Sequence, residues 1–338
     1  PSSPTAGAPV LELDIEVPRR RFSVAVAFNV GVGERFALFG PSGAGKTTVL
    51  EAVAGLVSPQ RGSVSLAGQI LWAKADGRRA SIQVPPWQRG VALLRQEPSL
   101  FPHLSVQGNL TYSRRSGAAD LDRLVGMLEL EGLLDARPSD LSGGQAHRVA
   151  LARALASDCR ALLLDEPYAG LDVALRRQVT ALVRDEVGRR AVPAVLVSHE
   201  LTEAQAFADK LGIIDDGRLL QVGTPHEVVL HPASRRVAEV VGYQGFVTLN
   251  GVIIGVHPER VRLGAHPRLG PVLNGRLVRA RPAGSGFEAD LSVGDAELTC
   301  RLQAGIGSPG ATVEITVIDP PLFRPDGSVV SQHPKVLA

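Results

Sequence analysis

The chain has 338 residues, enough for about two domains, and 44% hydrophobic and 21% charged residues are ordinary for a folded globular protein. Its 36 glycines and 24 prolines stay below the share of roughly 25–30% that is typical of low-complexity sequence. A formal net charge of +2 is too small for an electrostatic argument about nucleic acid, and a pI of about 8.8 leaves a weakly basic surface open; no nucleic acid is expected as a partner, but the charge does not decide this.

Two further properties concern the compartment. No apolar run approaches the roughly 18 residues of a membrane span, and residues 1–9 lack the pattern of a secretion signal. We therefore expect a chain that is neither inserted nor secreted, with residues 1–9 as a flexible tail. Cys159 and Cys300 have no partner motif, which favours two reduced thiols in a cytoplasmic protein.

The first two thirds of the chain predict an α/β fold. Alternating segments favour antiparallel strands, and continuous apolar runs favour strands buried on both faces of a parallel sheet. Expected strands are 11–17, 22–32, 35–40, 63–72, 90–95, 161–164 and 194–198, with a turn at 19–21. Expected helices are 47–56, 120–134, 144–157, 173–187 and 235–241. From Val247 onward short alternating runs between turn residues predict a small all-β barrel or sandwich, including strands 276–280, 287–293, 297–302 and 313–318.

A glycine-rich loop joins the strand at 35–40 to the helix that follows. Its sequence matches the phosphate-binding loop, in which backbone N–H groups approach the phosphates, the lysine reaches the β and γ oxygens, and a threonine hydroxyl binds Mg²⁺. Lys46 is one of only four lysines in the sequence, whereas most of its 36 basic residues are arginines. The candidate nucleotide-binding residues here are Gly40, Pro41, Ser42, Gly43, Ala44, Gly45, Lys46, Thr47 and Thr48.

Two adjacent carboxylates end the buried strand at 161–164. Because neighbouring residues of a strand point to opposite sides, we expect different roles for them. Asp165 suits the Mg²⁺ shell, and Glu166 suits orienting or deprotonating the attacking water.

The segment Leu141-Ser-Gly-Gly-Gln145 precedes a helix and offers a second anion site at a helix N-terminus. This segment resembles the signature motif of ATP-binding cassette (ABC) ATPases. The resemblance spans about residues 10–240. It implies an ABC ATPase domain with an antiparallel β subdomain and a helical subdomain at about 97–157, followed at 243–338 by an OB-like β regulatory domain.

Other positions resemble the family's remaining motifs in order. Gln96 resembles the Q-loop glutamine, residues 170–172 resemble the D-loop, and His199 resembles the switch histidine. The resemblance implies ATP and Mg²⁺ as cofactors. It also implies a head-to-tail homodimer, in which the signature of one chain completes the nucleotide site of the other. Implied catalytic residues are Glu166, His199 and Gln96; implied metal ligands are Thr47, Gln96 and Asp165; further implied nucleotide-binding residues are Ser142, Gly143, Gly144, Gln145 and Asp172.

The sequence departs from the family's pattern in four places. Ala169-Gly170 stands where Ser-Ala is common, and His147 replaces a frequent Gln. No aromatic residue aligns with the ring that stacks on adenine: the aligned position is near Val17, and Phe22 is a candidate that could equally be a core residue. In the tail, His257 stands where an Arg more often precedes the Pro of residues 255–263.

The resemblance also implies partners. Residues Leu100–Val106 resemble the surface that holds integral-membrane permease subunits, with an extracytoplasmic solute-binding protein acting indirectly, and this places the chain peripherally at the cytoplasmic face of the cell membrane. Those apolar residues could instead be core. Residues 107–112 resemble molybdate importer ATPases. Importers of tungstate, sulfate, ferric iron, polyamine or sugar remain alternatives, as does a soluble ABC ATPase acting on nucleic acid or the ribosome. The tail could be an oxyanion sensor or only a dimer clamp.

Overall fold

A computed structural model describes residues 9–74, 82–112, 118–303 and 307–330. The chain divides into two compact units, Pro1–Pro225 and His226–Ala338. Of the predicted tail, residues 1–8 lie outside the described part, while Pro9 begins the first strand. The domain boundaries drawn from the sequence stay predictions. No helix among the described residues is both long and apolar enough to cross a membrane.

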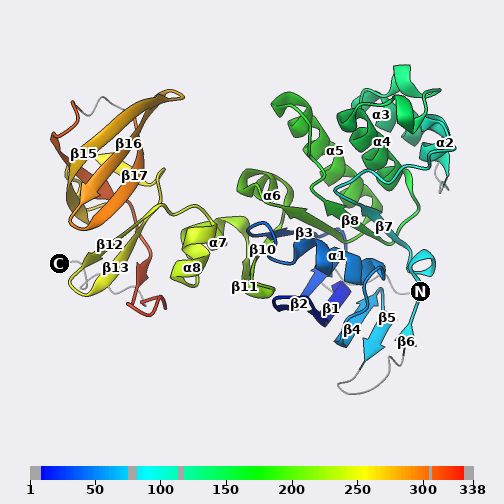
Figure 1. Cartoon of the computed structure of the whole chain (residues 1–338), viewed down its shortest axis with the longest axis horizontal. Helices are drawn as coiled ribbons and strands as arrows, with labels where there is room; N and C mark the ends of the chain where they lie inside the picture. The colour runs from blue at the N-terminus through cyan, green and yellow to red at the C-terminus, as the bar shows by residue number, and fades with distance from the viewer. Residues whose placement is uncertain (1–8, 75–81, 113–117, 304–306, 331–338) are drawn as a thin grey trace. The chain divides into compact units, whose positions relative to one another are not determined.

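The first unit is built on one mixed sheet of eleven strands, in the order β6-β5-β4-β1-β2-β11-β10-β3-β9-β8-β7 (Figure 1). The parallel part comprises β3 (Arg35–Phe39), β7 (Val91–Leu94), β8 (Ala161–Asp165), β9 (Ala194–Ser198) and β10 (Lys210–Asp215). Every residue of β8 and β9 is buried, which confirms that the continuous apolar runs are strands covered on both faces. Helices α1 (Lys46–Ala54), α4 (Gly143–Ala156), α5 (Val173–Arg190) and α6 (Leu201–Phe207) belong to the same unit.

The other end of the sheet is mainly antiparallel. It comprises β1 (Pro9–Pro18), β2 (Ser23–Gly31), β4 (Arg61–Leu66), β5 (Gln69–Lys74), β6 (Ile82–Gln83) and β11 (Arg218–Gly223), the last pairing parallel with β2 and antiparallel with β10. The prediction of one strand over 63–72 is wrong, because Ala67 and Gly68 both have positive φ and turn the chain back as a hairpin. The alternation of apolar and polar residues keeps its period of two across a two-residue turn, so the sequence pattern does not reveal the turn.

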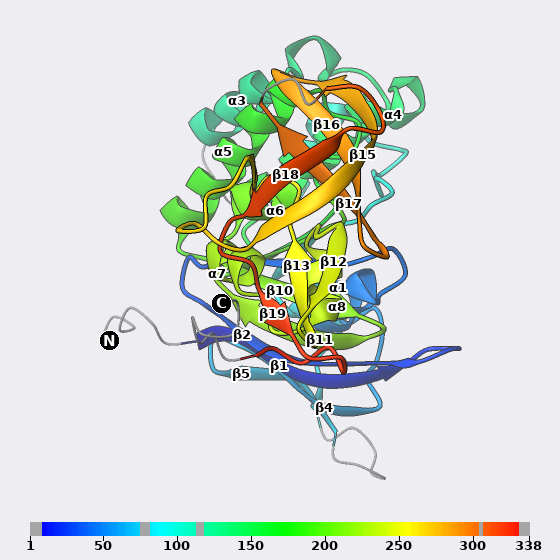
Figure 2. The same ribbon diagram turned by 90° about the vertical axis from the view of Figure 1, so that its left-hand side faces the viewer.

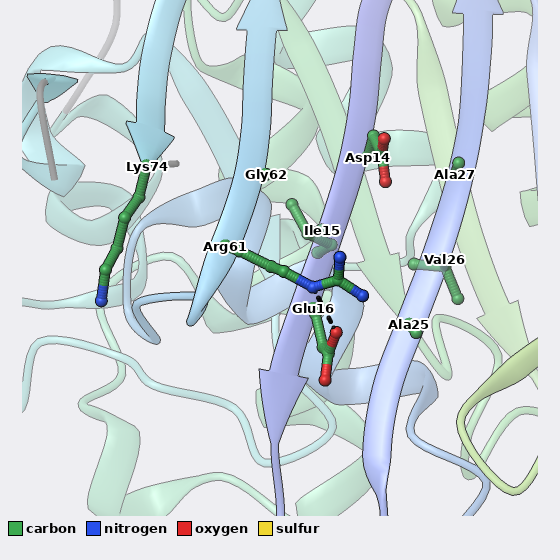
Figure 3. Close-up of a pocket in the computed structure, with 9 residues that line it drawn as sticks. All are labelled: Asp14, Ile15, Glu16, Ala25, Val26, Ala27, Arg61, Gly62 and Lys74. Carbon is green, nitrogen blue, oxygen red and sulfur yellow. Dashed lines mark hydrogen bonds and ion pairs between the residues drawn. The ribbon is translucent and has the colours of Figure 1, made fainter. Parts of the chain in front are cut away.

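One face of this antiparallel region builds the core and the other is polar. Leu11, Leu13 and Ile15 of β1 are buried in the main hydrophobic cluster, whereas the intervening acidic residues face outward. Figure 3 shows that outer face, a hollow of about 400 Å³ in which Glu16 pairs with Arg61 (Nε to Oε2, 2.6 Å). The apolar residues of the pattern predicted for this strand therefore face the core, and the polar residues between them face solvent.

A helical subdomain lies next to β7 and β8 (Figure 1). It contains α2 (Val106–Thr111), α3 (Ala118–Met127), the 3₁₀ turns η2 (Glu131–Leu133) and η3 (Pro138–Asp140), and the start of α4; a further turn, η1 (Pro86–Gln88), precedes β7. The helix predicted over 120–134 ends at Met127, because Glu129 is left-handed (φ 53°) and the backbone N–H of Leu130 bonds back to Val125. A glycine normally marks such an end, so the sequence carries no signal for it.

The second unit confirms the small all-β domain. After α7 (Pro225–Leu230) and α8 (Arg235–Val240), it forms a sheet of β12 (Gly245–Leu249), β13 (Val252–Val256) and β19 (Leu322–Phe323). A second, antiparallel sheet has the order β14 (Val261–Leu263), β18 (Thr312–Val317), β15 (Val272–Ala283), β16 (Gly286–Val293) and β17 (Ala296–Leu302). Figure 2 shows the long β15 and β16 side by side. Their inward residues share one hydrophobic cluster with Val247 and Val256 of the smaller sheet.

Candidate functional site

The phosphate-binding loop joins β3 to α1, as predicted, and its glycines are required by space as well as by backbone conformation. A Cβ on Gly40 would lie 2.0 Å from the carbonyl oxygen of Ile214 in β10. Gly45, the residue before α1, has φ 103°, and a Cβ there would lie 2.6 Å from Val24 of β2. The loop is therefore wedged between two strands, with the N-terminus of α1 directed into it.

The side chain of Lys46 lies inside the loop. It is 7% exposed, and its Nζ donates to the carbonyl oxygens of Gly40 (2.7 Å) and Pro41 (2.9 Å). Burial lowers the pKa of this ammonium, and the nearby carboxylates of Glu166 and Asp165 oppose that change. The lysine is thus held at the position from which it can transfer its N–H donors to an anion in the loop.

Asp165 and Glu166 both line the cavity next to this loop. Asp165 is the last residue of β8, and the hydroxyl of Thr47 donates to its carboxylate. Burial raises the pKa of Asp165, and the charge of Glu166 acts in the same direction while Thr47 and Lys46 act against it. The carboxylate therefore lies where a cation would relieve its desolvation.

Glu166 corrects the expectation that adjacent carboxylates point to opposite sides. β8 ends before it, and Glu166 is left-handed with φ 51°. A non-glycine residue pays on the order of 1–3 kcal/mol for such a conformation and keeps it only where its surroundings fix it. Its N–H donates to Val197 of β9, and its carbonyl accepts from Ala169. This turn brings both carboxylates to one cavity with different partners.

His199 is the partner of Glu166. It follows β9, and its Nδ1 lies 2.8 Å from Oε1 of Glu166, 33 residues away in the sequence. The hydrogen bond to Glu166, together with that residue's charge, raises the pKa of His199. Because the side chain of His199 is 59% exposed at the cavity, its other ring nitrogen is accessible to a ligand.

These residues enclose a single cavity of about 430 Å³. Its lining comes from the loop, β7 to β9 and the segments that follow those strands: Ser42, Gly43, Gly45, Lys46, Thr47, Thr48, Gln96, Asp165, Glu166, Val197 and His199. The structure thus brings together all three residues predicted to be catalytic. It also brings together the hydroxyl of Thr47, the amide of Gln96 and the carboxylate of Asp165, an all-oxygen donor set that fits Mg²⁺.

The signature segment is absent from this lining. Ser142 caps α4 in a reciprocal capping box: its Oγ accepts from the N–H of Gln145 (3.3 Å), and Oε1 of Gln145 accepts from the N–H of Ser142 (2.8 Å). A Cβ on Gly144 would meet only the carbonyl of Gly170, at the ordinary distance of 3.5 Å. The signature and the phosphate loop of one chain therefore do not form one pocket.

Asp172, which the resemblance implies as a nucleotide-binding residue, and His147, which replaces a frequent Gln, both have structural partners. Asp172 caps α5, accepting hydrogen bonds from the N–H groups of Ala174 (2.9 Å) and Leu175 (3.0 Å). His147 is 3% exposed, and its Nε2 lies 3.1 Å from the carbonyl oxygen of Pro167, directly after Glu166. Burial lowers the pKa of His147, so the neutral ring is favoured. The substituted histidine thus braces the turn that carries Glu166.

Neither residue considered for adenine stacking lines the cavity in the described chain. Val17 is 1% exposed and belongs to the main core, and Phe22 packs against the same core and against Gly217. Arg19, which the sequence assigned only to a turn, contacts the first turn of α1: its Nε donates to Oγ1 of Thr48 (2.9 Å). The run of three arginines at this turn was the sequence feature that could have indicated this contact.

The predicted permease-contacting segment forms a loop held by one buried side chain. Asn109 of α2 is 0% exposed; its amide donates to the carbonyls of Phe101, Leu104 and Ser105, and its Oδ1 accepts from the N–H of Phe101 (2.8 Å). The motif compared with molybdate importers thus organises this loop. Around the loop lie exposed aromatic rings: Tyr112 packs on Phe101 at 4.2 Å and is 62% exposed.

Arg153 of α4 links this loop to a second surface. Its guanidinium lies over the Phe101 ring (5.0 Å to the centroid) and donates to the carbonyl oxygen of Ser99 (2.7 Å). The same side chain lines a cavity of about 290 Å³ beside Trp87, which is 82% exposed. Apolar and aromatic side chains therefore extend from the loop to η1.

In the second unit, His257 stands where an Arg is more common in the family. Its ring packs edge-on against Tyr243 (5.1 Å between centroids), and its Nδ1 accepts from the N–H of Glu259 (3.3 Å). Burial lowers the pKa of His257. Cys300 is buried here and Cys159 in the first unit, both as free thiols.

Comparison with known proteins gives one family. The model of the ABC transporter family matches residues 24–169. A molybdate/tungstate import ATP-binding protein of Thermococcus kodakarensis is 36% identical over 261 residues, covering 72% of this chain and 76% of that protein. A ferric-ion import ATP-binding protein of Mesorhizobium japonicum is 39% identical over 222 residues, covering 64% of this chain and 60% of that protein. The chain thus spans about three fifths of the length of the iron-import relatives it matches.

Solved structures agree on the fold. The structure described as an ATP-binding subunit of an ABC transporter superposes with a TM-score of 0.56 at 26% identity, covering 69% of this chain and 95% of that one.

Proposed function

Because this chain belongs to the ATP-binding subunits of ABC transporters, we propose that it hydrolyses ATP to drive the import of a small solute. The observation that carries the proposal is the single cavity in which Lys46, Asp165, Glu166 and His199 meet. Their arrangement supports phosphoryl transfer to water, since it combines a phosphate cradle, a carboxylate suited to a cation and a second carboxylate suited to act as a base.

Each residue has a part that follows from its contacts. The loop N–H groups bind the β and γ phosphates, and Lys46 exchanges its bonds to two loop carbonyls for bonds to phosphate oxygens. Glu166 orients the attacking water and accepts its proton. His199 holds the Glu166 carboxylate through Nδ1 and is placed to donate to the γ-phosphate from Nε2.

Mg²⁺, when bound, would neutralise charge on the β and γ phosphates. Thr47, Asp165 and Gln96 would hold it, since their oxygens line the same cavity. Binding there accords with the raised pKa of Asp165, because a cation stabilises a carboxylate that burial has destabilised.

The second anion site favours a homodimer. Ser142 and the glycines after it form a helix N-terminus outside the cavity of their own chain. In a two-fold head-to-tail dimer, that helix end of one chain would meet the γ-phosphate bound by the other. ATP binding would then close the dimer, and hydrolysis would open it.

A permease is the partner that we propose for the aromatic surface around Leu100–Val106. Exposed Trp87 and Tyr112, with Arg153 between them, form the kind of aromatic and arginine anchor found in protein interfaces. We place the chain peripherally, at the cytoplasmic face of the membrane, with a solute-binding protein acting through the permease.

Molybdate or a related oxyanion is the cargo that we propose first. Its support is the likeness to a molybdate/tungstate import protein and the sequence from Gly108 to Tyr112. Ferric iron is a second candidate, because a ferric-ion import protein is 39% identical over 222 residues. Because Asn109 bonds within its own loop, that sequence bears on the cargo only through the permease that this loop is proposed to contact. The C-terminal β unit is proposed as a regulatory domain.

Hydrolysis of MgATP by the purified chain tests the activity, with Lys46→Ala as the inactive reference. Cargo is tested by co-purifying the permease and measuring ATP-dependent uptake of molybdate and of ferric iron into vesicles. Phosphate release unaffected by Lys46→Ala would reject the catalytic assignment, and uptake of neither ion would reject both cargoes.

A further inference from the structure

The turn that carries Glu166 packs on the first turns of α4 at two points. Nε2 of His147 lies 3.1 Å from the carbonyl oxygen of Pro167, and because a carbonyl can only accept, the ring donates this hydrogen bond. A Cβ on Gly170 would lie 3.7 Å from the Cα of Gly144, so the two backbones run close together there. His147 and Gly144 are three residues apart and therefore share one face of the helix. That face of α4 supports the turn from one side.

His147 has no contact with the nucleotide cavity itself. It is 3% exposed and is absent from the cavity lining. Burial lowers the pKa of its ring, and hydrogen bonds to the carbonyl groups of Pro167 and Glu166 oppose that change. A neutral imidazole has one N–H, and here that N–H is used on the turn. Any effect of His147 on hydrolysis must therefore pass through Glu166.

The other side of Glu166 is held by β9 and the residue that follows it. The N–H of Glu166 donates to the carbonyl oxygen of Val197 (3.0 Å), and its Oε1 lies 2.8 Å from Nδ1 of His199. With φ at 51°, Glu166 keeps an unfavourable backbone conformation that persists only while its surroundings fix it. Loss of the bond from His147 would free one side of the turn while the contacts to β9 remain.

We propose that His147 is a positioning residue, which holds Glu166 from the start of α4 in the conformation that lets it act as the base. The inference rests on the proposed role of Glu166 and adds to it the means by which that role is maintained. It also assigns a use to a substitution, since His147 stands where the family frequently has Gln. Because α4 begins at the second anion site, the same bond ties the base of one chain to the helix end proposed to meet the partner's nucleotide.

The test compares three substitutions of His147 in the whole chain. His147→Leu removes the donor, His147→Asn carries an amide too short to reach Pro167, and His147→Gln retains a donor of nearly the original length. Arg148→Leu is the matched control, because Arg148 donates from the next position of α4 to a carbonyl oxygen of a different segment, that of Leu128 (2.8 Å).

Two readouts separate positioning from packing. A single hydrogen bond shifts an equilibrium by up to about tenfold, so we expect kcat for MgATP to fall roughly five- to tenfold in His147→Leu and His147→Asn, with KM within about twofold of wild type. The pKa of the His199 ring, measured by NMR without nucleotide, should fall toward its ordinary value of about 6.5 in the same two variants, because Glu166 is released from it. His147→Gln and Arg148→Leu should match the wild type in both readouts.

Three results would overturn the proposal: a kcat within about twofold of wild type in His147→Leu and His147→Asn, an unchanged pKa of His199 in both, or an equal loss of kcat in His147→Gln. A wild-type chain that hydrolyses no ATP would instead refute the proposed function, and the NMR readout, which needs no nucleotide, would still decide whether His147 holds Glu166. Thermal denaturation shows whether each variant folds, and His147→Asn keeps the comparison decisive if His147→Leu does not.

Discussion

Replacing Glu166 by glutamine separates the charge of this side chain from its position. The amide oxygen of glutamine can still accept the hydrogen bond from Nδ1 of His199, which spans 2.8 Å in the native pair. What the variant loses is the base. General-base assistance contributes about 10²–10⁴ in rate, so the activation free energy should rise by about 3–5 kcal/mol while MgATP still binds.

The same substitution has a second, independent consequence at His199. The hydrogen bond and charge of Glu166 raise the pKa of His199, so that pKa should fall in Glu166→Gln. With a raised native pKa, the histidine adds stability that is complete below its ordinary value of about 6.5 and disappears as the pH rises through the native pKa. The variant should therefore lose stability relative to wild type at acid pH, and the two should converge at alkaline pH.

Steady-state phosphate release, ATP titration and NMR titration of the His199 ring measure these effects, with Glu12→Gln on the outer sheet face as a control for loss of one carboxylate. Hydrolysis within about threefold of wild type would refute the assignment of the base. An unchanged pKa of His199 would show that the pair does not interact in solution.

Three further substitutions test how the site is built. Gly40→Ala places a Cβ 2.0 Å from the carbonyl oxygen of Ile214 and should destabilise the chain by about 3 kcal/mol or more in urea unfolding, whereas Gly143→Ala, with open space around its Cβ, should cost less than about 1 kcal/mol; equal losses would contradict the packing argument. Asp172→Ala removes a cap that accepts from two N–H groups and should lower the unfolding free energy by about 1 kcal/mol, so a loss below about 0.3 kcal/mol would argue against the cap. His147→Gln should lose less stability than wild type between pH 7 and pH 5. The buried ring has a lowered pKa, so the unfolded chain takes up the proton first as the pH falls; equal acid sensitivity of both proteins would count against this.

Short sequence patterns were enough to predict those parts of the site whose residues are neighbours in the sequence. Lys46 and Thr47 lie at the predicted junction of loop and helix, because a buried strand, a glycine loop and a helix follow one another in the sequence. The order of motifs also led to Glu166 and His199. Their 2.8 Å contact, however, depends on the parallel pairing of β8 and β9, which no short segment encodes.

The errors arose where a backbone conformation was not visible in the residue types. Glu166 and Glu129 both adopt positive φ, which is uncommon for glutamate, so one carboxylate was assigned to the wrong side and one helix was predicted too long. The hairpin at Ala67 and Gly68 was hidden by alternation on both of its sides. Arg19 was missed because its partner, Thr48, is 29 residues away.

The central claim is that ATP is bound between the phosphate loop of one chain and the signature of another. The most direct test is light scattering of Glu166→Gln with MgATP, compared with the double variant Glu166→Gln, Gly144→Trp. The fold has room for a Cβ at Gly144, which would meet only a carbonyl oxygen at 3.5 Å. We predict that the single variant is a dimer with MgATP and a monomer without it, and that the double variant binds ATP with unchanged affinity yet stays monomeric. A double variant that still dimerises with ATP, or a single variant that never does, would contradict the claim.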